Sequence, residues 1–541
     1  MTAGTTILGA PRPIWTRAAV VPQAARWLPL AFILVVQAVL SVRLISHSYV
    51  SGDEGRYIYA GHQLIYEFWH GGGSPYYETY FSGAPAIYPV LAAMADHLGG
   101  LVEACLLSLA FMLTATTLLF TTTRRLFGYW PGVLAAGLFA GLGLTQDLGV
   151  LATYDAMALM LTAAAAYCAV RTADAEKRAT AWLLAIPLVL LAANATKYMT
   201  VLFDPVVIAL AALQVSDCGW RRMAGRITAL GVATVSILTL ALFLAGGAYV
   251  NGLMFSTLAR PSGSQAVFSA VVAPRSVIVG DTWRWMGVTL VGSLIALVLA
   301  ARSGKGWKPV ALVGLLLLAG IAVTVEGLHL QTVESLRKHD DFAAWFACVA
   351  AGSVAGLPRL QSRFAGWITA VAVGCAAILS GIQYTSLASS TFEAGGSSRP
   401  LYVAAALKSY LAIPDGRYLI GGLGEDQILY LDHLPVRWFQ HFDDLYIKYP
   451  IPGRGGDSHG QAPGLACFRL EPHCMYLEGI AGYRAAIRAH WFTLISMYGA
   501  HGTKQDAQIV TAIDRTPGYV LLTQVGGAPT WIYPPAYHEP G

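Results

Sequence analysis

The feature that most limits what this chain can fold into is a series of long apolar stretches. A helix that crosses a bilayer needs roughly 20 mostly apolar residues, and about eleven stretches near that length follow one another between residues 27 and 385. They lie near 27–46, 101–122, 131–146, 155–170, 179–194, 200–216, 227–248, 286–301, 309–324, 341–357 and 365–384. Only 12% of the residues are charged, whereas soluble domains carry about a quarter charged residues. The sequence therefore predicts an α-helical polytopic membrane protein.

Basic residues punctuate these stretches in a regular order. Clusters of Lys and Arg precede the first stretch and then fall at every second loop, as the positive-inside rule requires of cytoplasmic loops. They lie within 12–26, 124–125, 171–178, 221–226, 302–308 and 359–363. The net charge of +5 is therefore a topology signal and does not indicate nucleic-acid binding. We expect a cell-membrane protein with a cytoplasmic segment 1–26, a transmembrane region 27–385 and an extracytoplasmic C-terminal part.

The predicted outer face begins with a long first loop, residues 47–100. This loop is rich in Tyr, Phe and Trp, which favour the lipid headgroup layer. Within it, residues 56–69 have the pattern of an amphipathic helix lying on the membrane surface. Two further outer loops are expected at 249–285 and 325–340.

The composition changes after the last apolar stretch. Residues 386–400 contain GGSSRP and are predicted to be a linker. In the following part, 401–541, helix-like and strand-like stretches alternate, which is typical of a small α/β domain. Helices are expected at 400–411, 425–434, 480–489 and 503–514, and strands at 417–423, 491–496 and 518–525.

Two cysteines, Cys467 and Cys474, lie in this C-terminal domain. In an oxidising compartment such a pair is expected to form a disulfide. The alternatives are two unpaired thiols and, less favoured because no other ligand cluster is close in sequence, a zinc pair completed by His473. No metal site is predicted.

Three acidic residues stand at the predicted outer edge of the membrane. Asp53 and Glu54 lie in SGDEGRY just after the first span, and Asp155 begins the fourth span. Solvated loop acids and a carboxylate facing a helix dipole are the ordinary explanations of such residues. Acids boxed in by aromatics at a membrane interface are more often functional, and two carboxylates at one depth can divide the work of general base catalysis. Asp147 is a weaker substitute for Asp155.

Basic residues also occur at this outer edge, against the rule that orders the other clusters. Arg337, Lys338 and His339 lie in ESLRKHDDF, and Lys197 lies between the fifth and sixth spans. They are candidates for binding a specific phosphate, for which Arg and Lys are the usual partners. The alternatives are a patch on anionic headgroups for the cluster, and a snorkelling side chain for Lys197.

Together these motifs resemble the GT-C superfamily of membrane glycosyltransferases, and within it the protein O-mannosyltransferases and the aminoarabinose lipid A transferases. The resemblance rests on the DE pair after the first span, the aromatic first loop, Asp155, TKYMTVLFDP and the RKH loop, and covers about residues 27–385. It implies transfer of a sugar, with inversion, from a polyprenyl phosphate to a glycan, lipid or protein outside the cytoplasm.

Carried over residue by residue, the resemblance makes Asp53 the base and Glu54 its companion. It makes Asp155 the second acid and places Lys338 near the carrier phosphate. The chain departs from the aminoarabinose transferases in one place, because its first loop reads FSGAPAIYP (81–89) where that group has a Lys-Pro motif. The cation that this motif would supply must therefore come from elsewhere in the chain.

The chemistry suits these residues. Fixed cations stabilise a departing phosphate, and carboxylates favour an oxocarbenium-like transition state. No cofactor is therefore required, although a divalent cation is left open. Two other functions compete with the glycosyltransferase. A flippase of lipid-linked sugars would place its charges near the midplane of the bilayer and often shows repeated halves, and a glycan-binding membrane protein would leave the acidic pair unexplained.

Overall fold

The computed structural model describes most of the helical region and parts of the C-terminal region. The described residues are 27–45, 52–71, 81–174, 176–254, 273–331, 336–356, 381–384, 386–387, 407, 416–421, 438–441, 448–450, 476–497, 504–525 and 528–536. The structure leaves undescribed most of the predicted linker, the helices expected at 400–411 and 425–434, and the cysteines Cys467 and Cys474. Of these segments it describes only Ser386, Leu387 and Leu407. The disulfide therefore stays a prediction.

Six of the described helices are long and apolar enough to cross a membrane. They are α1 (Leu28–Ile45), α4 (Leu101–Phe127), α8 (Glu176–Thr196), α10 (Trp220–Ala245), α12 (Arg275–Arg302) and α13 (Trp307–Leu330). Each overlaps a span predicted from the apolar stretches. Large apolar side chains such as Phe32, Leu188 and Phe243 stay exposed on these helices, as expected where a helix faces lipid.

Four further predicted spans are present as helices outside this group, three of them shorter or interrupted. They are α5 (Tyr129–Gly141) with α6 (Gly143–Leu148), α7 (Tyr154–Arg171), the 3-10 helix η3 (Tyr198–Phe203) with α9 (Asp204–Leu213), and α14 (Leu336–Gly352) with η6 (Ser353–Gly356). Leu142 has an extended backbone and breaks the first of them. Of the last predicted span, 365–384, only 381–384 are described, and they are helical.

Two of the expected outer loops were predicted too long. Helix α12 begins at Arg275, whereas the span was expected from 286, and α11 (Gly247–Met254) occupies the start of the same loop. The loop at 325–340 is mostly helical, since α13 ends at Leu330 and α14 begins at Leu336. Polar residues near these helix ends interrupt the apolar pattern, so the apolar stretches are shorter than the helices that contain them.

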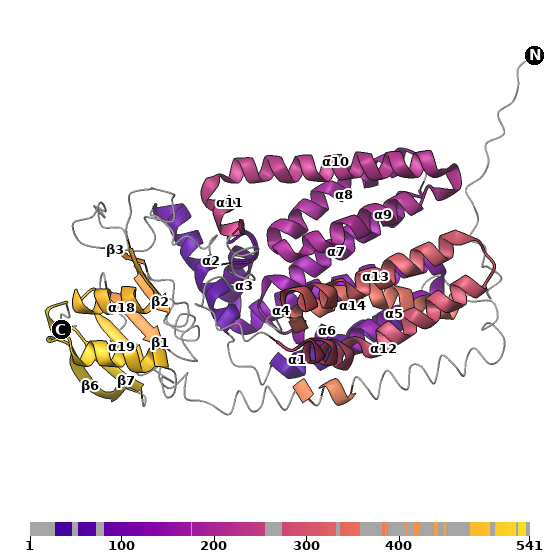
Figure 1. Ribbon diagram of the computed structural model, residues 1–541. Helices are drawn as coiled ribbons and strands as arrows, with labels where there is room; N and C mark the ends of the chain where they lie inside the picture. Colours follow the sequence, from indigo (N-terminus) through magenta and orange to yellow (C-terminus); the bar gives the residue numbers. More distant parts are fainter. Residues whose placement is uncertain are drawn as a thin grey trace, which may run out of the picture.

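Helix α14 lies in the middle of the bundle, against α5, α12 and α13 (Figure 1). Small residues let its neighbours approach, because a Cβ at Gly320 would lie 3.0 Å from the Cβ of Ala347. Ser293 donates a hydrogen bond of 2.8 Å to the carbonyl oxygen of Ala347. The described side chains from Asp340 to Ala351 are all buried, so the first turn of α14 projects from a rigid support.

The first outer loop contains two helices, α2 (Gly52–His70) and α3 (Tyr88–Gly99). The helix predicted at 56–69 is therefore present, but one of its faces packs on protein, since Tyr57 and Ile58 are buried. Gly61 makes this packing close, because a Cβ there would lie 1.9 Å from the carbonyl oxygen of Pro89.

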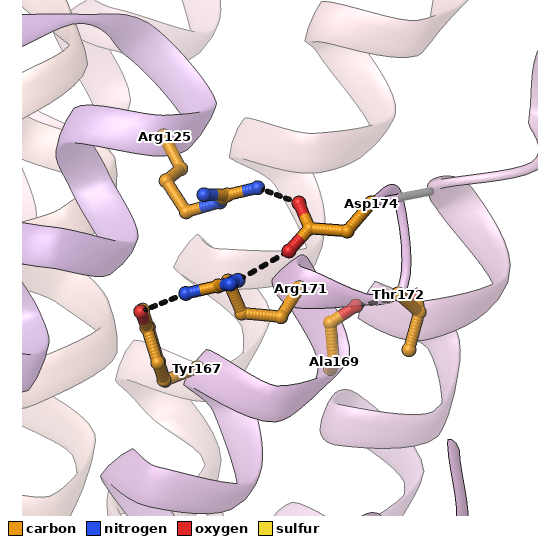
Figure 2. A network of polar contacts seen from close by, with 6 residues as sticks. All are labelled: Arg125, Tyr167, Ala169, Arg171, Thr172 and Asp174. Carbon is orange, nitrogen blue, oxygen red and sulfur yellow. Dashed lines mark hydrogen bonds and ion pairs between the residues drawn. The ribbon is translucent and has the colours of Figure 1, made fainter. Parts of the chain in front are cut away.

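A polar network joins the ends of α4 and α7 (Figure 2). Arg171 donates a hydrogen bond of 2.6 Å to Asp174 and one of 2.7 Å to the hydroxyl of Tyr167. Arg125 forms an ion pair with the same Asp174 carboxylate. Arg226, in the first turns of α10, donates to the hydroxyl of Thr172 at 3.1 Å. Three of the predicted cytoplasmic clusters thus meet at one end of the bundle.

The C-terminal region contains a five-stranded mixed sheet of order β2-β1-β5-β7-β6. Its strands are β1 (Arg417–Gly421), β2 (Trp438–His441), β5 (Leu494–Met497), β6 (Val520–Val525) and β7 (Ala528–Ile532). A two-stranded sheet of β3 (Lys448–Pro450) and β4 (Tyr476–Glu478) and the helices α18 (Gly479–Arg488) and α19 (Lys504–Asp514) accompany it. The predicted α/β character of this region is confirmed, whereas the strands β2, β3, β4 and β7 were not predicted.

Candidate active site

Asp53 and Lys338 form an ion pair although 285 residues separate them in sequence. The Lys338 ammonium donates a hydrogen bond of 2.5 Å to Oδ2 of Asp53. Asp53 lies in the first turn of α2 and Lys338 in the first turn of α14. The exposed fractions of the two side chains are 47% and 19%, respectively. The pair is therefore partly open to solvent, as a site for an incoming substrate has to be.

A second ion pair joins Asp155 and Lys197. Asp155 lies in the first turn of α7, and Lys197 directly precedes η3 in an extended conformation. Their side chains are only 2% and 4% exposed. The ammonium of Lys197 also lies 5.1 Å from the ring centroid of Tyr154, within the range of a cation–π contact. Lys197 therefore turns inward and does not snorkel.

The two ion pairs form one electrostatic unit, which we call the four-charge cluster (Asp53, Asp155, Lys197 and Lys338). Burial lowers the pKa of Lys338, but the carboxylates of Asp53 and Asp155 together raise it above its ordinary value. Lys338 thus interacts with both predicted catalytic acids. The cluster alternates in sign and has no formal excess charge, so an added anion must compete with a carboxylate for the lysines.

Burial raises the pKa of the Asp53 carboxyl, but the ion pair and hydrogen bond with Lys338, helped by Arg56, bring that pKa below its ordinary value of 3.8. Solvent tempers the effect because the side chain is half exposed. Asp53 is therefore an ionised but weak base while Lys338 remains bound to it.

The loop segment without a lysine lies directly beside Lys197. The amide of Ala84 donates to the carbonyl of Ala195 at 2.7 Å, and the amide of Tyr198 donates to the carbonyl of Ser82 at 2.9 Å. Only glycine fits between them, because a Cβ at Gly83 would lie 2.0 Å from the carbonyl oxygen of Thr196. The structure thus brings a cation from the start of η3 to the first loop, where the sequence motif has none.

Glu54 is buried and accepts hydrogen bonds. Its Oε1 accepts a hydrogen bond of 2.7 Å from the amide of Ala152, and the thiol of Cys105 lies 3.7 Å from the same oxygen. These contacts tie α2 to the segment that leads into α7. Glu54 is therefore placed to set the distance between Asp53 and Asp155.

The other members of the basic motif differ from Lys338. Arg337 pairs with Asp147 at 2.9 Å. Burial and the Lys197 ammonium hold the pKa of His339 well below its ordinary value, so its imidazole is neutral at pH 7. Sequence reasoning missed Tyr154, which packs on Tyr57 with ring centroids 4.5 Å apart beside the cluster. Tyr154 directly precedes Asp155 in the sequence, and this position could have identified it as a site residue.

The sequence predicts no metal site but leaves the involvement of a divalent cation open. Within the described ranges, no three or more His, Cys, Asp or Glu side chains gather where they could hold a metal ion.

Comparisons with known proteins place this arrangement in a wider setting. Residues 85–245 match the model of the dolichyl-phosphate-mannose-protein mannosyltransferase family. No curated protein sequence matches the chain. The fold is similar to ArnT from Cupriavidus metallidurans, solved bound to undecaprenyl phosphate, with 14% identity and a TM-score of 0.61 over 94% of this chain and 98% of that one.

A second solved structure is also similar. It is the oligosaccharyltransferase AglB from Archaeoglobus fulgidus, in complex with an inhibitory peptide and a dolichol-phosphate, with 12% identity and a TM-score of 0.54 over 94% of this chain and 75% of that one. The resemblance to the GT-C superfamily that the motifs indicate is thus confirmed, and this multi-pass membrane protein has the GT-C fold.

Proposed function

We propose that this protein is a membrane glycosyltransferase that moves a sugar from a polyprenyl phosphate to an acceptor outside the cytoplasm, with inversion at the anomeric carbon. The observation that carries the proposal is the four-charge cluster, in which two lysines accompany two acids at the ends of separate helices. The structures of similar fold support the donor class, because one was solved with undecaprenyl phosphate and another with a dolichol-phosphate.

The mechanism begins with an exchange of partners at Lys338. A donor phosphate competes with Asp53 for the ammonium, and each lysine contact that moves to the phosphate stabilises the charge that develops there as the bond to the sugar breaks. When Lys338 leaves Asp53, burial raises the pKa of that carboxyl. Asp53 therefore becomes a stronger base only when the donor is bound.

The transfer step then balances as follows. Asp53 takes the proton of the acceptor hydroxyl, and the acceptor oxygen forms a bond to the anomeric carbon on the face opposite the phosphate. The bond from that carbon to the phosphate oxygen breaks, and polyprenyl phosphate leaves with the electron pair. Asp155 stays ionised beside Lys197 and favours the oxocarbenium-like transition state. Glu54 supports Asp53 from the buried side.

The experiment uses the purified full-length chain in lipid nanodiscs with labelled polyprenyl-phosphate sugars, offered one at a time with glycan, lipid and peptide acceptors. The wild type should form product with at least one donor. Asp53→Asn keeps the shape of the side chain and removes its basicity, so turnover should fall by about 10²–10⁴-fold. Glu67→Gln, on the same helix, is the matched control and should keep its activity.

Two outcomes would contradict the proposal. One is an Asp53→Asn variant with undiminished transfer, which would overturn the role of Asp53 as the base. The other is movement of intact labelled donor across the bilayer of proteoliposomes without any product, which is the behaviour of a flippase.

A further inference from the structure

Helix α6 makes two side-chain contacts with the first turns of α14. Arg337 Nε lies 2.9 Å from Oδ2 of Asp147, and the hydroxyl of Thr145 donates a hydrogen bond of 2.9 Å to Oδ1 of Asp341. Thr145 and Asp147 both belong to the six-residue helix α6. Neither contact is part of the four-charge cluster, yet both border Lys338.

The spacing of these contacts fixes how α14 is rotated. Arg337 and Asp341 are four residues apart and so lie on one face of the helix. A single contact would fix the height of the helix end but leave the helix free to rotate about its axis. Two contacts on one face fix both the height and the rotation. Lys338 follows Arg337 directly, so its direction toward Asp53 depends on that rotation.

Helix α6 has supports of its own. The amide of Gly143 donates to Oε1 of Gln383 at 2.9 Å, and the hydroxyl of Ser41 donates to the carbonyl of Gln146 at 3.4 Å. Gly143 is also closely packed, because a Cβ there would lie 2.9 Å from the Trp285 ring. The helix can therefore act as a fixed reference for α14.

The burial of the two contacts separates their roles. Thr145 and Asp341 are fully buried, so this hydrogen bond belongs to the packing of α14 on α6. The Arg337 side chain is 45% exposed, and an exposed ion pair adds little to stability. The ion pair of Arg337 with Asp147 therefore mainly orients Arg337, the residue next to Lys338.

We propose that Asp147 is a positioning residue that acts through Arg337 to hold Lys338 in reach of the donor phosphate. Arg337 is then not a ligand of the phosphate, in contrast to the expectation from sequence. The proposal rests on the function proposed above and deepens it.

The test is a charge swap in nanodiscs, with undecaprenyl phosphate as the binding probe. Asp147→Arg and Arg337→Asp should each weaken binding of the probe and raise the donor KM by roughly ten- to a hundredfold, as small misplacements in such sites do. The double variant Asp147→Arg/Arg337→Asp should recover most of the loss. If Arg337 itself binds the phosphate, the double variant stays as weak as Arg337→Asp, and the proposal is wrong.

The matched control is the same swap in Asp217 and Lys308, an exposed ion pair of 2.6 Å near the end of the bundle where α13 begins. It should leave probe affinity and donor KM unchanged. Thr145→Val, a milder change, should shift affinity in the same direction as Asp147→Arg. Unchanged affinity in Asp147→Arg, with Lys338→Ala impaired, would overturn the proposal.

A second measurement does not depend on any donor. The coupling between Asp53 and Lys338 is obtained from the Tm values of wild type, Asp53→Asn, Lys338→Gln and the double variant. The same cycle is then repeated with Asp147→Arg present. The coupling should shrink in that background and return with the charge swap. This readout tests positioning even if the wild type binds no undecaprenyl phosphate, an outcome that would count against the proposed function instead.

Discussion

The two ends of α7 carry ion pairs of very different character. At its last turn, Arg171 and Arg125 share the carboxylate of Asp174, and Arg171 also stacks 4.8 Å from the Trp182 ring centroid. At its first turn, Asp155 pairs with Lys197 in a buried setting. The ends are about 24 Å apart at 1.5 Å per residue, close to the ~30 Å of a hydrocarbon core.

This difference in burial indicates a structural role for the Arg171 network and a functional role for the Asp155–Lys197 pair. The Arg171 network is partly exposed and has more cations than acids, which suits a solvated edge of a membrane protein. The Asp155 pair is almost fully buried, where desolvation opposes the charges and the pair gains little net stability. Charges kept in such a place at a membrane edge are best explained by function. Four predictions, of which the first was designed above with Asp53, test this contrast.

The largest effects outside Asp53 are expected at Lys197. Lys197→Met leaves the carboxylate of Asp155 buried without its partner, which typically costs about 3–5 kcal/mol, and removes a cation from the donor phosphate. Unfolding of the variant in detergent should show this loss, and sugar transfer should be abolished. Asp155→Asn/Lys197→Met should regain stability but not transfer. A stable and active Lys197→Met variant would show that the ion pair at the Asp155 end of α7 matters no more for function than the ion pairs at the Arg171 end.

The next effect concerns the pH dependence of transfer. Asp53 must be ionised to accept a proton, and its pKa is lowered in the donor-free enzyme, where Lys338 is bound to it. The pH dependence of kcat/KM reports the ionisations of the free enzyme, so kcat/KM of the wild type should persist well into the acid range. In Lys338→Gln, the ammonium that lowers the pKa of Asp53 is gone. Burial then raises that pKa. The acid limb of the pH–rate profile should therefore move to higher pH, although the residual rate is low. The control Lys308→Gln should leave the acid limb in place. If the acid limb also stays in place in Lys338→Gln, Lys338 does not set the pKa of Asp53.

The smallest effect is expected at the other end of α7. Arg171→Gln breaks one partly exposed ion pair, which is typically worth about 0–1 kcal/mol, and leaves Arg125 to pair with Asp174. Thermal unfolding should change slightly, and kcat and KM for the donor should match the wild type. A loss of transfer as large as that of Lys197→Met would show that the two ends work as one unit.

Much of the fold could be predicted because the bilayer imposes a length on each apolar stretch. The spans expected at 27–46, 155–170 and 179–194 match α1, α7 and α8 to within a few residues. The strand β7 escaped prediction because it is short and carries Pro529 in its second position, which is unusual in a strand. The side of the membrane on which each end lies, and the disulfide of Cys467 and Cys474, stay predictions.

The sequence by itself also determined which residues to suspect. Asp53, Asp155 and Lys338 stand out because charges at the edge of apolar stretches break a strong compositional rule. Which of them meet was decided only by the tertiary structure. The pairing of Lys338 with Asp53, and of Arg337 with Asp147, depends on how α14 is rotated and how far it projects. That rotation follows from the packing of small residues and buried polar contacts between helices far apart in the chain, and no local pattern records it.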